Sequence, residues 1–156
     1  MTKTVAERLR ERDITIPEPP PSGDFHLPIG RTGNLLFVSG QQPIVNGERR
    51  FIGRVGAEIS PEDGRRAARV CGLNMIGQVS KALDGDLERI VRCVKLWGYV
   101  NAAPDFLASP DVIHGASELV IDVFGEERGL HARVALGAGP LPFNVAAIVD
   151  GVWEVA

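Results

Sequence analysis

The sequence predicts an α+β domain in which a mixed sheet carries two helices on one of its faces. Two long segments show helical periodicity, and segments of strand character surround them in the order β-β-β-α-β-α-β-β. The chain has 156 residues, the length of one ordinary domain. We divide it into an N-terminal arm with a short helix, 1–24, and a folded domain, 25–156.

The arm begins with a short helix and continues as a proline-rich segment. Val5 and Leu9 are four residues apart in the charged run 4–12, which favours a short helix. The sequence IPEPPPSGD that follows cannot extend this helix, because proline lacks a backbone N–H and restricts its own φ angle. We therefore expect the rest of the arm to pack on the surface of the domain.

The folded domain begins with a predicted hairpin. The sequence TGN at 32–34 supplies turn residues between two strand-like runs, 26–30 and 35–45. A second turn, NGERR, leads to a short third strand, FIGRVG at 51–56. These three strands form the first part of the expected sheet.

Two helices supply the layer that covers the sheet. The first has Ser60 as its N-cap, Pro61 at its first position and Gly85 beyond its end. The second is expected at 111–125, with Asp111 as its N-cap. Apolar residues recur along both segments at the helical period, so each helix buries one stripe against the sheet.

Three further strands complete the expected sheet, and the first of them follows the first helix. The segment 91–100 alternates, and we expect one of its faces to carry Val91, Cys93, Lys95, Trp97 and Tyr99.

The last two strands, 132–139 and 145–155, are apolar on both faces. One face of the sheet meets the helices, whereas the other needs a partner, since a large exposed apolar face marks an interaction surface. A homo-oligomer with pockets between its protomers is the expected solution.

Composition and charge exclude several classes of protein. Hydrophobic residues make up 44% and charged residues 24% of the chain, as in ordinary globular domains. The net charge is −3 and there is no basic stripe, so we expect no nucleic-acid partner. Cys71 and Cys93 lack metal-type spacing and are expected to be buried, reduced thiols of a cytoplasmic protein. No signal peptide or membrane-spanning run is present, so we expect no membrane partner.

Five segments in order resemble the YjgF/RidA family of reactive-intermediate deaminases. They are GNLLFVSGQQPIV, the helix after ISPEDG, KLWGYVNAAPDF, VIHGASELVIDVFGE and HARVALGAGPLPFNVAAIV. The resemblance covers about residues 25–155 and is closest to a divergent subgroup. It implies a chorismate-mutase-like fold, a homotrimer with clefts between subunits, and hydrolysis of imines and enamines to 2-oxo acids without a cofactor. Some members are described as endoribonucleases.

The resemblance also implies site residues. The family's carboxylate-binding arginine corresponds to Arg133, whose planar guanidinium suits a carboxylate. A structural ion pair is the alternative role for this charge. The serine of the family's SGQ sequence corresponds to Ser39, beside Gly40, and is expected to hydrogen-bond the substrate's amine or a water molecule. The alternative is a serine that caps backbone at a strand end.

Four cleft positions depart from the family pattern. A tyrosine that closes the cleft in many members corresponds to His26, and an asparagine corresponds to His114. The glutamate that orients the attacking water corresponds to Ile148, and a common cysteine corresponds to Ala135. Isoleucine can act neither as an acid nor as a base, so the substitution at 148 argues against full deaminase competence. Asp150, two residues further along the strand, lies about 6.6–6.8 Å away.

The chain's three histidines all fall in these motif segments. Imidazole titrates near neutral pH, so we assign His26 and His114 as a candidate acid–base pair beside Arg133. His131 fits the family's HAR sequence and is expected to be structural. No HxH or HxxxH spacing occurs, and we therefore predict no metal site.

Three functions remain open at this point. The first is hydrolysis of a small 2-imino acid, with its carboxylate held by Arg133. The second is another reaction on the same scaffold, such as tautomerisation, cyclisation, decarboxylation or ring hydrolysis, which uses His26 and His114. The third is a trimer that binds a small carboxylate-bearing metabolite without catalysis. Ribonuclease activity is disfavoured by the acidic net charge.

Overall fold

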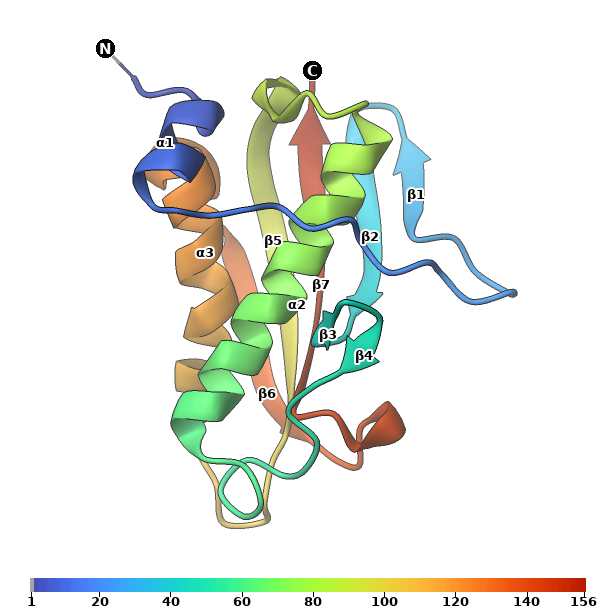
Figure 1. Cartoon of the computed structure of the whole chain (residues 1–156), viewed down its shortest axis with the longest axis vertical. Helices are drawn as coiled ribbons and strands as arrows, with labels where there is room; N and C mark the ends of the chain where they lie inside the picture. Colours follow the sequence, from blue (N-terminus) through green and yellow to red (C-terminus); the bar gives the residue numbers. More distant parts are fainter. Residues whose placement is uncertain (1) are drawn as a thin grey trace.

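The computed structural model describes residues 2–156, and it folds as one sheet with its helices on one side (Figure 1). The helical segments are α1 (Val5–Glu11), α2 (Pro61–Ala82), α3 (Ser109–Gly129) and the 3-10 turns η1 (Leu87–Arg89) and η2 (Pro142–Asn144). The strands are β1 (Ile29–Thr32), β2 (Leu35–Gln41), β3 (Ile44–Val45), β4 (Glu48–Arg49), β5 (Ile90–Asn101), β6 (Ala132–Ala138) and β7 (Ala147–Val155). The predicted α+β class and the packing of the two long helices on one face are confirmed.

The main sheet has the strand order β1-β2-β7-β5-β6. The β5–β6 pair is parallel and the other three pairs are antiparallel, so the sheet is mixed. Helix α3 makes the crossover from β5 to β6, which parallel neighbours require. As a result β6 forms one edge of the sheet, and the hairpin β1–β2 forms the other.

The start of α2 agrees with the sequence signals. The Ser60 side chain accepts a hydrogen bond from the backbone N–H of Asp63, and Pro61 occupies the first turn. The start of α3 differs, because the helix begins at Ser109 with Ala108 as its N-cap. The prediction that Asp111 caps this helix was therefore wrong. Pro110 is tolerated in the first turn, where its missing N–H costs no hydrogen bond.

The predicted third strand at 51–56 is absent from the sheet. Ile52 and Val55 form only isolated bridges, while the short hairpin β3–β4 lies outside the main sheet. Glycine φ angles of +133° at Gly53 and +89° at Gly56 account for the difference. These angles turn the chain where an extended strand would have to continue.

The prediction that Cys93 shares a face of β5 with Lys95, Trp97 and Tyr99 was wrong. Irregular register between β5 and β7 occurs on both sides of Cys93, at 90–92 and 93–95. Each irregularity changes which side chains point to a given face. Cys93 therefore lies in the core with Cys71, and burial raises the pKa of both thiols. Their predicted burial is confirmed, and both are free thiols.

The proline-rich part of the arm, residues 16–22, crosses the outer surface of α2 in an extended conformation, and we call this segment the strap (Figure 1). The Gln78 side-chain amide donates a hydrogen bond of 2.8 Å to the Pro20 carbonyl oxygen. The carbonyl oxygen of Pro17 lies only 2.7 Å from the position that a Cβ atom on Gly77 would take. Glycine at 77 therefore permits the strap to lie directly on the helix.

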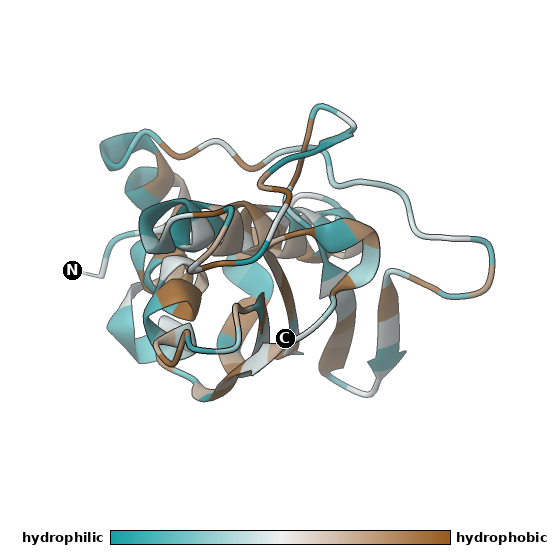
Figure 2. Ribbon diagram, turned by 90° about the horizontal axis from the view of Figure 1, so that it is seen from below, coloured by the Kyte–Doolittle hydropathy of each residue, from teal (hydrophilic) through white to brown (hydrophobic). Residues whose placement is uncertain are grey.

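The sheet face opposite the helices, the open face, has no element over it (Figure 2). Phe37, Val134 and Leu136 are exposed there to 46%, 36% and 41%. Large apolar side chains are therefore exposed on this face on both β2 and β6, which is typical of an interaction surface. Within residues 2–156, no helix combines the length and apolar character needed to cross a membrane.

Candidate active site

The structure places the predicted site residues in two groups at opposite edges of the sheet. His26, Ser39 and Gly40 line a cavity of about 300 Å³ at the end of β2, which we call the His26 cavity. Ile148 of β7 belongs to this group, because its Cγ2 atom is 3.0 Å from the position of a Cβ on Gly40. Arg133, Ala135 and His114 form the second group, on β6 and the adjacent helix α3.

Ser39 is a hydrogen-bond acceptor toward the His26 cavity. Its hydroxyl donates a bond of 2.6 Å to the carbonyl oxygen of Leu27. A serine hydroxyl has one proton and two lone pairs. Because the proton is engaged, Ser39 can accept a hydrogen bond from an imine N–H or from water. The alternative role predicted for Ser39, a backbone contact at a strand end, is thus present, and the hydroxyl oxygen can still accept a hydrogen bond from a ligand.

The lining of the His26 cavity includes two residues that the sequence patterns did not indicate, Arg49 and Phe143. The guanidinium carbon of Arg49 lies 3.5 Å from the ring centroid of Phe143. The Arg49 Nε donates a bond of 2.7 Å to the Gln42 side-chain oxygen. Phe143 has a φ angle of +56° in the turn η2. No period or motif in the sequence signals that this turn brings a phenyl ring against β4.

In the second group, Arg133 belongs to a chain of hydrogen bonds with Ser117 and His131, here called the Arg133 cluster. The Arg133 Nη1 donates a bond of 3.2 Å to the Ser117 Oγ. The Ser117 Oγ is 3.0 Å from the His131 Nε2, and the His131 Nδ1 is 2.6 Å from the carbonyl oxygen of Gly129.

These contacts assign the proton positions in the cluster. A carbonyl oxygen accepts only, so His131 carries its proton on Nδ1 and its Nε2 accepts the Ser117 hydroxyl. Burial lowers the pKa of His131, and the charge of Arg133 lowers it further, while the bond to Gly129 raises it. His131 therefore favours the neutral form that accepts from Ser117. His131 therefore orients the Ser117 hydroxyl, which in turn accepts the hydrogen bond from Arg133.

Arg133 has no acidic partner among residues 2–156. It forms none of the ion pairs found between residues 2 and 156, and its guanidinium is only partly exposed. The structural ion pair that was the alternative role for this charge is thus absent from the described part of the chain. The remaining N–H groups are available to an anion.

His114 and Ala135 accompany Arg133 on its side of the sheet. His114 is three residues before Ser117 on α3, so the two side chains share one face of the helix. Its Nδ1 lies 3.7 Å from the Asp111 carboxylate. Ala135 is partly buried against the hydrophobic core.

One chain does not bring the two groups together. Arg133 points to the helix side, because it contacts Ser117 of α3. Ile148 points to the open face, because its neighbours Ala147 and Val149 are fully buried and side chains alternate along a strand. Two strands, β7 and β5, separate β2 from β6, so the backbones that carry Ser39 and Arg133 are about 14 Å apart. A small ligand cannot contact both groups in one chain.

Asp150 also lies on the open face. Burial raises the pKa of its carboxyl group, and the hydrogen bond from the Tyr99 hydroxyl partly opposes this shift. It lies two residues beyond Ile148 on β7. In residues 2–156, no cluster of three or more His, Cys, Asp or Glu side chains is arranged to hold a metal ion.

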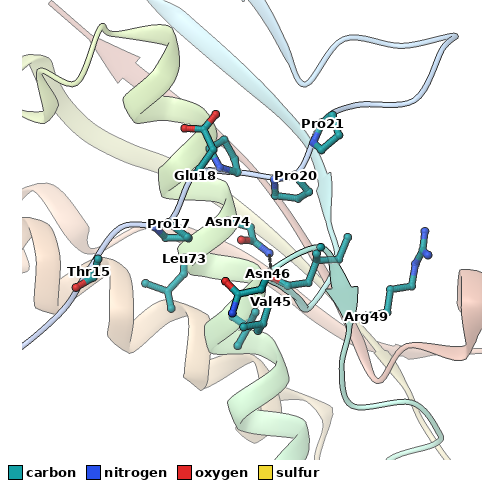
Figure 3. A pocket seen from close by; sticks show the side chains of 14 residues that line it. Thr15, Pro17, Glu18, Pro20, Pro21, Val45, Asn46, Arg49, Leu73 and Asn74 are labelled. Carbon is teal, nitrogen blue, oxygen red and sulfur yellow. Dashed lines mark hydrogen bonds between the residues drawn. The ribbon is translucent and has the colours of Figure 1, made fainter.

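A larger pocket of about 750 Å³ adjoins the His26 cavity (Figure 3). The proline strap forms one wall, α2 forms the floor at Leu73 and Asn74, and the β3–β4 hairpin forms the other wall. Arg49 lines both the pocket and the cavity, together with Pro20, Pro21 and Ile44. None of the predicted site residues lines the larger pocket.

Comparison with known proteins identifies the family. The model of the family described as "YjgF/chorismate_mutase-like, putative endoribonuclease" matches residues 7–155. The chain belongs to this YjgF/RidA family. The resemblance deduced from the five motif segments is confirmed, and so is the chorismate-mutase-like fold.

Individual YjgF/RidA relatives differ widely in their similarity. Protein TCP17 of Trypanosoma cruzi is 39% identical over 97% of this chain and 94% of its own length. The crystal structure of Atu1372 from Agrobacterium tumefaciens, of unknown function, is 39% identical, covers 97% of this chain and 92% of its own, and has a TM-score of 0.90. Escherichia coli TdcF with bound serine shares the fold at 16% identity, covering 89% and 94%, with a TM-score of 0.62.

Proposed function

We propose that this protein hydrolyses small 2-imino acids in clefts between neighbouring copies of a homotrimer. The observation that carries the proposal is Arg133, a partly buried cation that has a serine and no carboxylate as its partner in the described chain. Arginine binds carboxylates through two parallel hydrogen bonds. Every 2-imino acid has such a carboxylate beside the carbon that water attacks.

The division of the site supports an assembly between chains. The His26 cavity and the Arg133 cluster lie at opposite edges of the sheet, so a ligand that uses both needs two protomers. A head-to-tail ring joins one edge of each protomer to the other edge of its neighbour. The apolar open face supplies the additional surface that such an assembly buries.

The residues have separate roles in this cleft. Arg133 of one copy holds the carboxylate, and Ser39 of the next accepts a hydrogen bond from the imine N–H. His26 and His114 serve as the acid and base that move the protons of the attacking water and the leaving nitrogen. Water adds to the C=N carbon, the nitrogen gains protons, and the C–N bond breaks to release ammonia and a 2-oxo acid.

The serine bound in TdcF is consistent with this ligand class, because serine carries a carboxylate and a nitrogen on the same carbon. TdcF shares only the fold with this chain at 16% identity, so the likeness supports neither a specific substrate nor a position for the cleft.

A second candidate is a reaction that transfers protons without adding water, such as a tautomerisation. The observation that favours it is Ile148, which packs beside Gly40 where the family resemblance implies a water-orienting glutamate. Such a reaction needs the two histidines and the carboxylate anchor only. Exchange of the substrate's α-proton with solvent deuterium, without release of ammonia, distinguishes it from hydrolysis.

The test of the main proposal is an imine-hydrolysis assay. 2-Imino acids are generated in place by an amino-acid oxidase, and their loss is followed with and without the protein. We expect acceleration by the native protein and its loss in Arg133→Ala, since one charge-assisted contact contributes about tenfold to a hundredfold. Arg10→Ala, which removes an exposed charge on α1, is the matched control. An absence of acceleration by the folded native protein contradicts the proposal.

A further inference from the structure

We propose that the His26 cavity is itself an anion site, with Arg49 as its anchor, and that the substrates are therefore dicarboxylic imino acids. This inference rests on the proposed function, because Arg133 of the neighbouring copy would hold the first carboxylate. It assigns a second carboxylate, at the far end of the substrate, to Arg49.

The lining of the cavity contains the permanent positive charge of Arg49 and no acidic side chain. Arg49 and His26 line it, and none of the other lining residues is an aspartate or a glutamate. The polar groups that remain are the hydroxyls of Ser22 and Ser39 and the amides of glutamines such as Gln41. A small cavity with this lining attracts an anion and repels a cation.

Arg49 is oriented for this role by its neighbours. Stacking on Phe143 fixes the plane of the guanidinium, and the bond from Nε to Gln42 fixes its rotation within that plane. Both Nη groups remain without an acceptor among the described residues. A guanidinium that presents two free nitrogens in a fixed plane matches the two oxygens of a carboxylate.

The nearest carboxylate in the sequence does not neutralise Arg49. Glu48 forms its ion pair with Arg50, at 3.1 Å, and neither residue lines the cavity. Arg49 has no ion pair in residues 2–156, as is the case for Arg133. The chain thus presents one unpaired guanidinium in each half of the proposed cleft. A ligand with a single carboxylate would use only one of them.

Calorimetric titration with two stable probes tests this assignment. 2-Oxoglutarate carries two carboxylates, and 2-oxopentanoate has the same chain with one. We expect the native protein to bind 2-oxoglutarate about tenfold to a hundredfold more tightly. Arg49→Gln should abolish this difference by weakening the binding of 2-oxoglutarate. Arg50→Gln removes the adjacent charge outside the cavity and should retain the difference.

The two proposals fail in different ways. Equal affinity of the native protein for both probes, or no binding of either, overturns the Arg49 site. A preference for 2-oxoglutarate that persists in Arg49→Gln also overturns the Arg49 site. Arg133→Ala should weaken both probes, and if it weakens neither, the proposed anchor is wrong while the Arg49 result stands. Circular dichroism confirms that each variant is folded.

Discussion

At the residue scale, Arg133 is oriented by Ser117, whose hydroxyl is in turn oriented by His131. A long side chain at an edge strand has many rotamers, and holding one of them costs entropy. The cluster reduces that cost before a ligand arrives, which is the usual way in which fixed geometry improves affinity. The order of the three side chains thus links a buried serine to the proposed carboxylate binding.

Replacing Ser117 with alanine should weaken carboxylate binding without removing the charge. We expect Ser117→Ala to raise the Kd for 2-oxopentanoate about tenfold, because Arg133 loses its hydrogen-bond partner and its preferred orientation. Calorimetry measures this change. Ser80→Ala, which alters a hydroxyl on α2 outside both the cluster and the His26 cavity, is the control. An unchanged Kd in Ser117→Ala would show that Ser117 does not position Arg133.

His131 should make the folded state less stable as pH falls. Its pKa is lowered in the fold, so at mildly acidic pH the unfolded chain binds a proton that the folded chain does not. Stability is complete above the ordinary histidine pKa, about 6.5, and declines as pH falls toward the lowered value. Denaturant unfolding between pH 7.5 and 5.5 should show this slope in the native protein and a smaller slope in His131→Gln. Identical slopes would contradict the assignment.

At the element scale, local signals predicted most of the fold. The hairpin β1–β2 follows from a turn sequence between apolar runs, and α2 follows from Ser60 and Pro61 at its start. What the sequence did not reveal are local departures from regular strand geometry. The chain turns away from the sheet at Gly53 and Gly56, and β5 is irregular around Cys93. Neither feature leaves a mark in the apolar pattern of its own segment.

The contact between the strap and α2 gives a prediction at this scale. Gly77→Ala should destabilise the protein by about 1–3 kcal/mol, because its Cβ would lie 2.7 Å from the Pro17 carbonyl oxygen and displace the strap. Denaturant unfolding measures the loss, and limited proteolysis should cut the arm faster. Gly30→Ala is the control, since a Cβ there meets nothing within 4 Å. A gain in stability, as expected for a free helical glycine, would refute the contact.

At the scale of the whole molecule, the site residues were predicted as one cleft, and one chain holds them as two groups. The family motifs identify which positions matter, but they carry no information about which copy supplies each residue. Arg49 and Phe143 were missed for a related reason, because they meet only when β4 and the turn η2 fold against each other. Ser117 lies in the motif sequence HGAS, three residues after His114. Its hydrogen bond with Arg133 was not predicted, although the motif contains the residue.

The open face should be buried in the assembly. We expect Phe37→Glu to dissociate the oligomer, since a charge at this apolar position must be desolvated in an interface. Sedimentation velocity measures the oligomeric state. Leu107→Glu is the control, because Leu107 is 88% exposed in the loop before α3. A Phe37→Glu variant that sediments as the native protein does would place the interface elsewhere.

Subunit mixing in the imine-hydrolysis assay tests the central claim, that each cleft combines the His26 cavity of one copy with the Arg133 cluster of the next. Arg133→Ala removes one half, and Gly40→Leu obstructs the other. Each variant alone should be inactive. After refolding together, about a quarter of the clefts in a closed ring would contain two intact halves, and activity should return to about that fraction of the native value. A mixture as inactive as its parents, beside an active native protein, would show that each cleft lies within one chain.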